Sequence, residues 1–373
     1  MAEEASMRVL MDASCLGRGK TGNESYVRGL LSGWEQVGTE FPELELRPAV
    51  DAGARLEGGW QPVVLKPGGF GRRNFWNLPR ALEESGAALF HAMYWSAPWV
   101  KVPMVVTVHD VSFVRHPEWF RPGEAFFYRT CIAEVVRRAR MVLTVSEFSK
   151  REICEVWGVS AEKVMVTYNG AGLGLETAGR ELSPRSEGRP FLLSVGGWHP
   201  RKNLVTLIRA FERICERGHD LELHLVGPKT WLSGATERAW VGSRWRERIK
   251  DLGYLSGVEL DQEYRQALGL VYPSRYEGFG LPILEAFARD CPVCCSDIPA
   301  FREVAGEAAE YFDPEDAGHM AEQVLKMAES SDRVGALSGE RRRRLGLFRW
   351  EECARKTAVV YRKALGLGRD NRD

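Results

Sequence analysis

Short apolar runs alternate along the chain with longer segments whose apolar residues recur every three or four positions. The runs 105–108 and 191–195 are continuous and apolar, which is typical of strands buried on both faces of a parallel sheet. The segment 204–215 carries its leucines, isoleucine and phenylalanine on one face of a helix. This alternation predicts an α/β protein built on parallel sheets.

The expected strands and helices follow from these patterns and from the turn residues between them. Strands are expected at 7–12, 44–50, 62–65, 89–91, 104–108, 141–145, 163–167, 191–195, 221–226, 252–256, 267–272, 291–296 and 310–312. Helices are expected at 124–140, from 146, at 204–215, 229–250 and 259–267, from 281 or 282, and along the apolar stripe 350–365.

The strand–helix alternation occurs twice, and a Gly-, Ser-, Arg- and Glu-rich segment separates the two halves. We therefore expect a first Rossmann-like domain at 1–172, a linker at 173–190 and a second domain at 191–350. The length of 373 residues fits two domains of ordinary size.

Composition excludes several classes of protein. Hydrophobic residues make up 44% and charged residues 27% of the chain, and the formal net charge is zero, which argues against a general nucleic-acid binder. No apolar run approaches the ~18–20 residues that span a bilayer. Acids stand near the N-terminus where a signal peptide carries bases, so a cytoplasmic location is expected. The pair Cys291 and Cys294 has no second Cys or His pair at ligand spacing, so no metal site is expected.

One stretch, 274–285, carries the strongest chemical signal. It follows the strand expected at 267–272, and Gly280 and Pro282 predict a tight loop that leads into a helix. Glu277 and Glu285 flank this loop, which suits a polyhydroxylated, negatively charged ligand such as a sugar nucleotide. The alternative is that a Glu in the first turn only favours the helix dipole.

The loop after strand 191–195 offers a complementary set of charges. Arg201 and Lys202 follow two glycines and precede a helix, so they could clamp a diphosphate. An ordinary surface charge pair is the alternative. Similarly, His109 follows strand 104–108, at the sheet edge where α/β proteins bind ligands, and it could contact a hydroxyl or shuttle a proton. A structural histidine is the alternative there.

Three further segments allow more than one interpretation. The glycines of 17–22 match a dinucleotide fingerprint, but they lie too far beyond the first strand to form one. Ser146 is first of all a helix N-cap. In 70–80 aromatic residues alternate with Arg72, Arg73 and Arg80, which fits an anionic membrane surface or a lipid-linked acceptor, or else an ordinary surface loop and helix start.

The segment Glu277-Gly-Phe-Gly-Leu-Pro-x-x-Glu285 resembles the Glu-x7-Glu signature of the retaining, GT-B glycosyltransferases of family four. Other spaced elements of that family have matches here: Tyr272-Pro-Ser274, Val108-His-Asp-Val111 and Pro200-Arg-Lys-Asn203. The resemblance runs over most of the chain and is densest from 191 to 313.

The resemblance implies two Rossmann-like domains facing a cleft, with the helix of 351–373 returning to the first domain. It implies transfer of a hexose from a nucleoside diphosphate sugar, of GDP-mannose or UDP-hexose type, to an acceptor hydroxyl with retention and without a metal or cofactor. The acceptor would be a glycan, a lipid-linked compound or a small molecule. A GT-B-like sugar-nucleotide epimerase or hydrolase, or a non-catalytic sugar-nucleotide-binding protein, remains an alternative.

The same resemblance assigns roles to residues. The catalytic candidates are His109, Glu277, Lys202 and Arg201, with Lys202 neutralising the leaving diphosphate. Glu285 is expected on the ribose hydroxyls. The other donor-binding candidates are Gly22, Ser146, Gly197, Leu255, Val258, Gly278, Phe279, Gly280 and Leu281.

Overall fold

The computed structural model describes residues 6–17, 22–171, 188–329 and 331–367. The chain divides into two compact units, Met1–Leu173 with Phe348–Asp373 as unit 1 and Gly174–Leu347 as unit 2. Most of the expected linker at 173–190, and residues 18–21 of the first glycine segment, lie outside the described residues.

Unit 1 is built on a seven-stranded parallel sheet of order β3-β2-β1-β4-β5-β6-β7. Its strands are β1 (Met7–Asp12), β2 (Leu44–Asp51), β3 (Val63–Leu65), β4 (Leu89–Met93), β5 (Met104–Thr107), β6 (Met141–Thr144) and β7 (Val164–Val166). The order runs outward in both directions from the neighbours β1 and β4, so the topological switch point lies between them.

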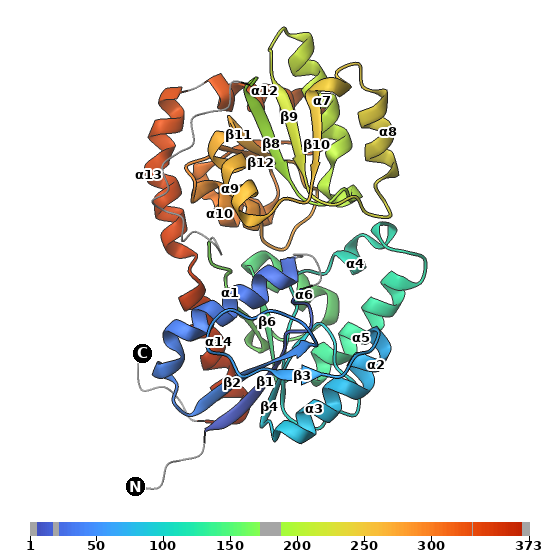
Figure 1. The fold of residues 1–373 in the computed structure, drawn as a ribbon, viewed down its shortest axis with the longest axis vertical. Coiled ribbons are helices and arrows are strands. Elements are labelled where there is room, and N and C mark those ends of the chain that lie inside the picture. The colour runs from blue at the N-terminus through green and yellow to red at the C-terminus, as the bar shows by residue number, and fades with distance from the viewer. Residues whose placement is uncertain (1–5, 18–21, 172–187, 330, 368–373) are drawn as a thin grey trace. The chain divides into compact units, whose positions relative to one another are not determined.

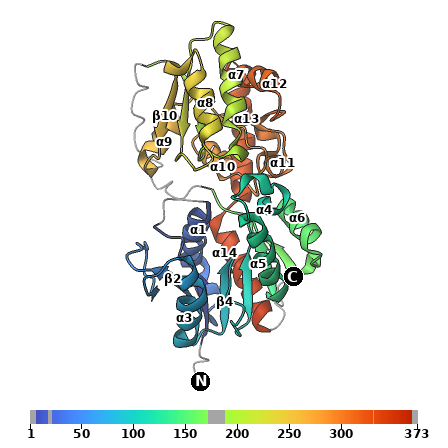
Figure 2. The same ribbon diagram turned by 90° about the vertical axis from the view of Figure 1, so that its right-hand side faces the viewer.

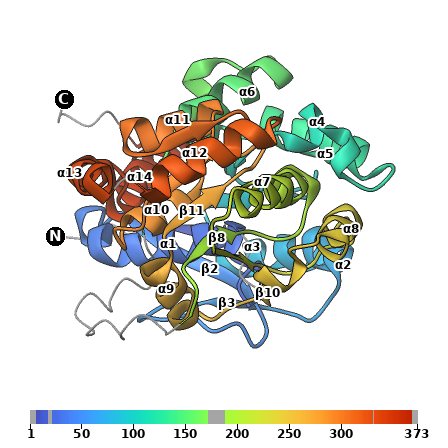
Figure 3. The same ribbon diagram turned by 90° about the horizontal axis from the view of Figure 1, so that it is seen from above.

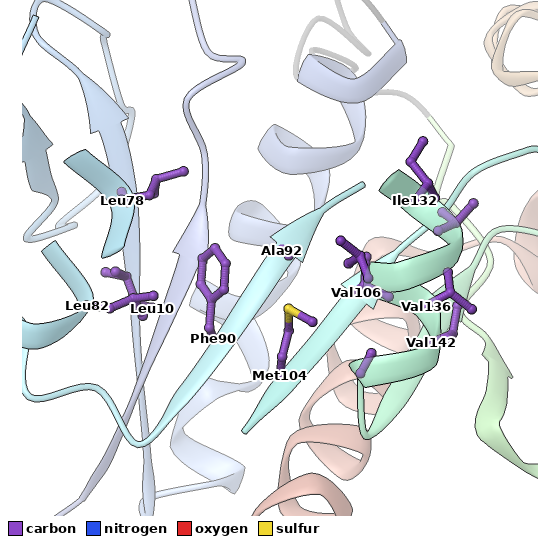
Figure 4. Close-up of a cluster of buried hydrophobic side chains, with 14 of the residues drawn as sticks. Leu10, Leu78, Leu82, Phe90, Ala92, Met104, Val106, Ile132, Val136 and Val142 are labelled. Atoms are coloured by element: carbon purple, nitrogen blue, oxygen red, sulfur yellow. The ribbon is translucent and has the colours of Figure 1, made fainter. Parts of the chain in front are cut away.

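Helices cover both faces of this sheet. The helices are α1 (Gly22–Val37), α2 (Phe70–Arg72), α3 (Leu78–Ser85), α4 (Ser112–Arg115), α5 (Glu124–Arg138), α6 (Glu147–Trp157) and α14 (Trp350–Leu365). Figure 4 shows the core on one face, where Phe90 and Val106 of the strands pack against side chains of α3 and α5.

Because side chains alternate along a strand, the neighbouring residues His91 and Thr107 face the opposite side, where α1 and α14 lie. Figure 1 shows α14, the last helix of the chain, alongside α1. Gly33 of α1 permits this close packing, because a Cβ there would overlap the backbone carbonyl of Trp350.

Unit 2 repeats the design with a six-stranded parallel sheet of order β10-β9-β8-β11-β12-β13. Its strands are β8 (Phe191–Val195), β9 (Glu222–Val226), β10 (Ile249–Gly253), β11 (Gly269–Tyr272), β12 (Val293–Ser296) and β13 (Glu310–Phe312). Its helices are α7 (Leu204–Glu216), α8 (Gly234–Gly242), α9 (Gly257–Gln266), α10 (Leu281–Phe287), α11 (Pro299–Ala305), α12 (Ala317–Glu329) and α13 (Ser331–Leu347). Figures 2 and 3 show α7 and α12 alongside each other.

The predicted α/β class with two Rossmann-like parallel sheets is confirmed. The prediction was wrong around 229–256, where a long helix and a strand at 252–256 were expected. Helix α8 spans only Gly234–Gly242, and β10 begins at Ile249, where its carbonyl accepts a hydrogen bond from the Trp240 indole at 3.0 Å. Trp240 thus contacts the edge strand of the sheet, and the chain turns there instead of extending a helix.

The four-arginine run 341–344 would be expected to form a solvated helix face, but two of its members are held within unit 2. Arg341 is only 2% exposed, and the Arg344 guanidinium donates to the backbone carbonyl of Val304 at 2.9 Å. These arginines hold α13 against unit 2. Across the described ranges, no helix combines the length and apolar character needed to cross a membrane.

Candidate active site

The topological switch point of unit 2 lies between β8 and β11, and the loops after these two strands carry the strongest candidates. Lys202 belongs to a 3₁₀ turn, Pro200–Lys202, between β8 and α7. Glu277 lies in the loop between β11 and α10. Because the carboxyl ends of both strands meet at one sheet edge, residues 75 positions apart in sequence come together.

Lys202 and Glu277 form a closely held ion pair. The Lys202 ammonium lies 2.6 Å from Oε1 of Glu277 and donates to the Tyr272 hydroxyl at 2.9 Å. The Arg201 guanidinium lies 3.9 Å from the other oxygen, Oε2, of Glu277. The side chains of Lys202 and Glu277 are 14% and 10% exposed, so water screens this pair weakly.

The charge state of Glu277 follows from this environment. Burial by itself raises the pKa of the carboxyl, but the charges of Arg201 and Lys202 and the hydrogen bond from Lys202 outweigh it and lower the pKa to about 2. Glu277 is therefore an anion at any physiological pH. The site presents one buried carboxylate beside two cations.

Backbone contacts fix the two loops relative to each other. The amide of Arg275 donates to the carbonyl of Arg201 at 2.8 Å, which joins the β11 loop to the β8 loop. Gly280, just before α10, has φ +123°, a conformation that L side chains rarely adopt, and a Cβ there would press on Phe301 at 3.1 Å. Gly280 thus has a conformational role in shaping the loop.

Glu285 lies in α10, and its carboxylate is fixed by a hydrogen bond from a neighbouring helix. The Tyr264 hydroxyl of α9 donates to Oε2 of Glu285 at 2.8 Å. Burial raises the pKa of Glu285 above its ordinary value, although the Tyr264 hydrogen bond and the charges of Arg289 and Lys202 oppose the rise. The charge of Lys202 thus acts on Glu285 as well as on Glu277, although the pKa values of the two carboxyls shift in opposite directions.

The remaining unit 2 candidates differ in accessibility. Val258, in the first turn of α9, is 53% exposed, whereas Phe279, in the loop before α10, is 5% exposed. A contact of the Phe279 backbone with a ligand stays a prediction. Gly278 is buried, and Gly197, Leu255 and Leu281 are half-buried along the loops that follow β8, β10 and β11.

His109 belongs to unit 1, where it follows β5. Its amide donates to the Tyr94 hydroxyl at 3.0 Å, and its carbonyl accepts from the Ser149 hydroxyl at 2.8 Å. Its ring lies edge-on to Tyr26, with 4.7 Å between ring centroids. Ring nitrogen Nε2 is buried and has no hydrogen-bond partner in the described structure. Burial lowers the pKa of His109 to about 4 against the opposing charge of Asp110, so the imidazole is neutral at pH 7.

A buried chain of hydrogen bonds supports the Tyr26 ring that touches His109. The Tyr26 hydroxyl lies 3.2 Å from the Thr107 hydroxyl, which is 2.7 Å from Nε2 of His91. On the other side of the imidazole, Nδ1 of His91 lies 2.7 Å from the Tyr361 hydroxyl of α14. The chain runs from the last helix to the ring beside His109.

The two other unit 1 candidates have structural roles in the described residues. Ser146 is fully buried, and its hydroxyl accepts the Ser149 amide at 2.9 Å, so it caps α6 as the N-cap interpretation predicts. Gly22 is the exposed first residue of α1. Any contact of either residue with a donor stays a prediction.

Sequence reasoning gave no role to three tyrosines of these sites. Tyr272 contacts Lys202, Tyr264 contacts Glu285, and Tyr94, which has φ +63°, contacts His109. Only Tyr272 had a local signal, because it ends β11 directly before the loop. Tyr264 lies on a helix 21 residues from its partner, and nothing in the local pattern marks it. In the ranges that the structure describes, no three His, Cys, Asp or Glu side chains gather in a way that could hold a metal ion.

Comparisons with known proteins agree with this architecture. Residues 177–346 match the family model for glycosyl transferases group 1, and residues 34–173 match that for Glycosyltransferase Family 4. The O-antigen chain mannosyltransferase B of Escherichia coli is 27% identical over 313 residues, 78% of this chain and 77% of that protein. The O-antigen chain mannosyltransferase RfbU of Salmonella typhimurium is 29% identical over 229 residues, 61% of this chain and 62% of that protein, so the match spans about three fifths of RfbU.

Among solved structures, a sucrose-phosphate synthase from Thermosynechococcus elongatus aligns with a TM-score of 0.74 at 20% identity, over 97% of this chain and 100% of that one. Two Rossmann-like units with this topology give the chain the GT-B fold of these solved structures. The chain belongs to the glycosyl transferases of group 1, and its first half to glycosyltransferase family 4.

Proposed function

We propose that this glycosyltransferase moves a mannosyl group from GDP-mannose to an acceptor hydroxyl, with retention of anomeric configuration and without a metal ion. The observation that carries the proposal is the buried Lys202–Glu277 pair at the switch point of unit 2, with Arg201 beside it. The choice of mannose draws on the relatives, which include two O-antigen chain mannosyltransferases.

The ion pair suits the charge that develops when a sugar–diphosphate bond breaks. The departing diphosphate gains negative charge, which Lys202 and Arg201 would stabilise in the role that a divalent ion plays elsewhere. Glu277 stays ionised down to a pH of about 2, so it would stabilise positive charge on the reacting sugar. The leaving phosphate is the proposed acceptor of the proton from the incoming hydroxyl.

The other candidates complete the proposed donor contacts. Glu285, held by Tyr264, would accept hydrogen bonds from the ribose hydroxyls. His109 would use the unpartnered Nε2 of its neutral ring for a sugar hydroxyl. Sugar binding would be favoured because this buried nitrogen, which lacks a hydrogen-bond partner, would gain one.

A nucleotide screen followed by turnover tests the proposal. GDP and GDP-mannose should raise the melting temperature more than UDP and UDP-glucose, because a ligand that binds the folded state stabilises it by mass action. Transfer of radiolabelled mannose should persist in EDTA, and an α-specific mannosidase should release the label. Lys202→Ala should lower the rate by on the order of 10²-fold or more.

Lys326→Ala provides the matched control, since Lys326 also pairs with a glutamate of unit 2 but is 44% exposed. Unaltered turnover in Lys202→Ala would exclude the proposed site. Donor hydrolysis that is as fast without acceptor as with it would favour the hydrolase alternative instead. A stronger shift with UDP-hexoses would overturn the choice of GDP-mannose while leaving the site intact.

A further inference from the structure

Unit 1 exposes large aromatic side chains from three segments that are separate in sequence. One segment is 70–76, at α2 and the π-helical turn that follows it; the second is the loop 95–99 after β4; the third is the first turn of α5. The exposed rings are Phe70 (42%), Trp76 (66%), Trp99 (50%), Phe126 (74%) and Phe127 (42%).

These rings contact one another across the three segments. Trp95 lies 5.2 Å, centroid to centroid, from both Phe70 and Phe127, so it joins all three segments. Trp76 and Trp99 pair 6.2 Å apart, on the same two segments as Phe70 and Trp95. We call residues 70–76, 95–99 and 126–127 together the aromatic surface. A grouped apolar patch of this kind marks an interaction site far more often than scattered exposed residues do.

Basic residues predominate around the aromatic surface, although Glu124 lies in the same first turn of α5 as Phe126 and Phe127. Residues 58–82 and 85–109 contain no Asp or Glu, and they carry the exposed basic residues Lys66, Arg72 and Lys101. Arg121 and Arg129 add exposed positive charge beside Phe126 and Phe127.

Two of the arginines that the sequence interpretation assigned to a membrane contact are buried or paired within unit 1. Arg73 is only 6% exposed, with Asp51 at 3.6 Å, and Arg80 pairs with Glu84 of its own helix at 2.6 Å. Arg72 is the exposed arginine of that run beside the aromatic rings. We call the exposed basic residues beside the aromatic surface the basic fringe: Lys66, Arg72, Lys101, Arg121 and Arg129. Only Arg72 of this set belongs to 70–80, and the fold brings the others to the same surface.

We propose that the aromatic surface seats unit 1 on an anionic lipid bilayer. Exposed Trp and Phe side chains favour the headgroup level of a membrane, and the basic fringe is complementary to anionic headgroups. A protein partner would be expected to meet a rim of mixed charge, whereas the first two segments of the aromatic surface, within 58–82 and 85–109, carry basic residues and no acids, which matches a negative surface. The occupant is therefore lipid.

The location of the aromatic surface gives the contact a consequence for the proposed reaction. Trp95 directly follows Tyr94, whose hydroxyl accepts a hydrogen bond from the amide of His109. Tyr94 follows β4 and His109 follows β5, and these two parallel strands end at the same edge of the sheet. Lipid contact here would bring that edge toward an acceptor carried on a lipid. This consequence rests on the proposed function, whereas the lipid contact itself does not.

Vesicle co-sedimentation of the full chain tests the proposal. The protein should sediment with phosphatidylcholine vesicles that contain phosphatidylglycerol, weakly with pure phosphatidylcholine, and less in high salt. The double variant Trp76→Ser/Trp99→Ser should weaken binding by about tenfold or more, because it removes apolar area from the membrane interface. Arg72→Glu/Lys101→Glu should weaken it by on the order of 10²-fold on the anionic vesicles.

Matched changes elsewhere serve as controls. Trp231→Ser removes a tryptophan of unit 2 that is 53% exposed, and Arg209→Glu reverses an exposed charge of that unit, so both should bind vesicles like the unchanged protein. The four patch substitutions are at exposed positions, so thermal unfolding should confirm that the variants fold.

The outcomes separate the two proposals. Unchanged sedimentation of both patch variants would overturn the lipid contact, as would equal binding to neutral and anionic vesicles. Concentration-dependent dimers that the tryptophan substitutions abolish would overturn it in favour of a second copy of the chain. Normal lipid binding without any sugar transfer would leave the lipid contact standing and refute the proposed function.

Discussion

Replacing Lys202 with alanine should leave a buried carboxylate without its nearest countercharge. Glu277 is 10% exposed at its side chain, and its pKa is about 2 instead of the ordinary 4.5. A shift of this size corresponds to about 3 kcal/mol of net preference for the ionised form. After the substitution, Arg201 at 3.9 Å is the cation that stays beside Glu277, and burial is less well opposed.

We expect Lys202→Ala to lower the free energy of unfolding of unit 2 by on the order of 3 kcal/mol at pH 7, as breaking a buried pair does. In the unchanged protein the depressed pKa of Glu277 contributes stability above pH 4.5 that is lost as pH falls through about 2. In the variant that pKa rises, so protonation relieves the unpaired charge. The difference between the two proteins should therefore shrink between pH 7 and pH 4.

Calorimetric unfolding of the full chain at both pH values measures this difference. Lys326→Ala breaks a longer pair, 3.1 Å, whose glutamate, Glu310, is also buried at 9% exposure but whose lysine is 44% exposed, so it should cost less than Lys202→Ala. In the Glu277→Gln background, Lys202→Ala should hardly change the free energy of unfolding, because the negative charge that Lys202 balances is absent. A loss in Lys202→Ala no larger than that in Lys326→Ala, or one independent of pH, would refute the reasoning.

Three further perturbations address other parts of the two sites. Tyr264→Phe removes the hydroxyl that donates to Glu285 at 2.8 Å, so GDP affinity measured by titration calorimetry should fall by about fivefold, and an unchanged affinity would argue against Glu285 as a nucleotide contact. Gly280→Ala should lower the free energy of unfolding by about 1–3 kcal/mol because of φ +123°, while Gly257→Ala, in open space at the start of α9, should not. The pKa of His109 is about 4 in the folded protein and 6.5 in the unfolded chain, so the free energy of unfolding decreases as pH falls from 6.5 through 4. In His109→Asn this decrease, measured by urea unfolding, should be smaller by up to about 3 kcal/mol. An identical pH dependence of the two proteins would contradict the burial argument.

Local pattern was enough to predict most strands and the loops that carry the candidate site residues. Buried parallel strands are short apolar runs, and β8 and β11 each end in glycine-containing loops, so Lys202 and Glu277 could be identified before their contact was known. Their pairing depends on strand order, because only the adjacency of β8 and β11 brings the two loops together. Sequence spacing says nothing about that adjacency.

The residues that sequence reasoning missed share a physical cause. Tyr264 of α9 contacts Glu285 of α10, and Arg341 is buried between elements that are far apart in sequence. A tyrosine or arginine on a helix has the same local appearance whether it faces solvent or a distant partner. The aromatic surface is a similar case, since Trp99 and Phe127 join the patch only through the fold.

The protonation states of the site predict which group limits donor binding in acid. Glu277 remains ionised to about pH 2, and His109 remains neutral above about pH 4, so neither changes its charge between pH 7 and pH 5. Glu285 differs, because burial raises its pKa above the ordinary 4.5. As pH falls through that raised pKa, the carboxylate becomes protonated and becomes a weaker acceptor for the hydroxyls proposed to bind it. An acid limb of nucleotide affinity that disappears in Glu285→Gln would therefore assign this step to Glu285, whereas a limb that persists in that variant would assign it to another group.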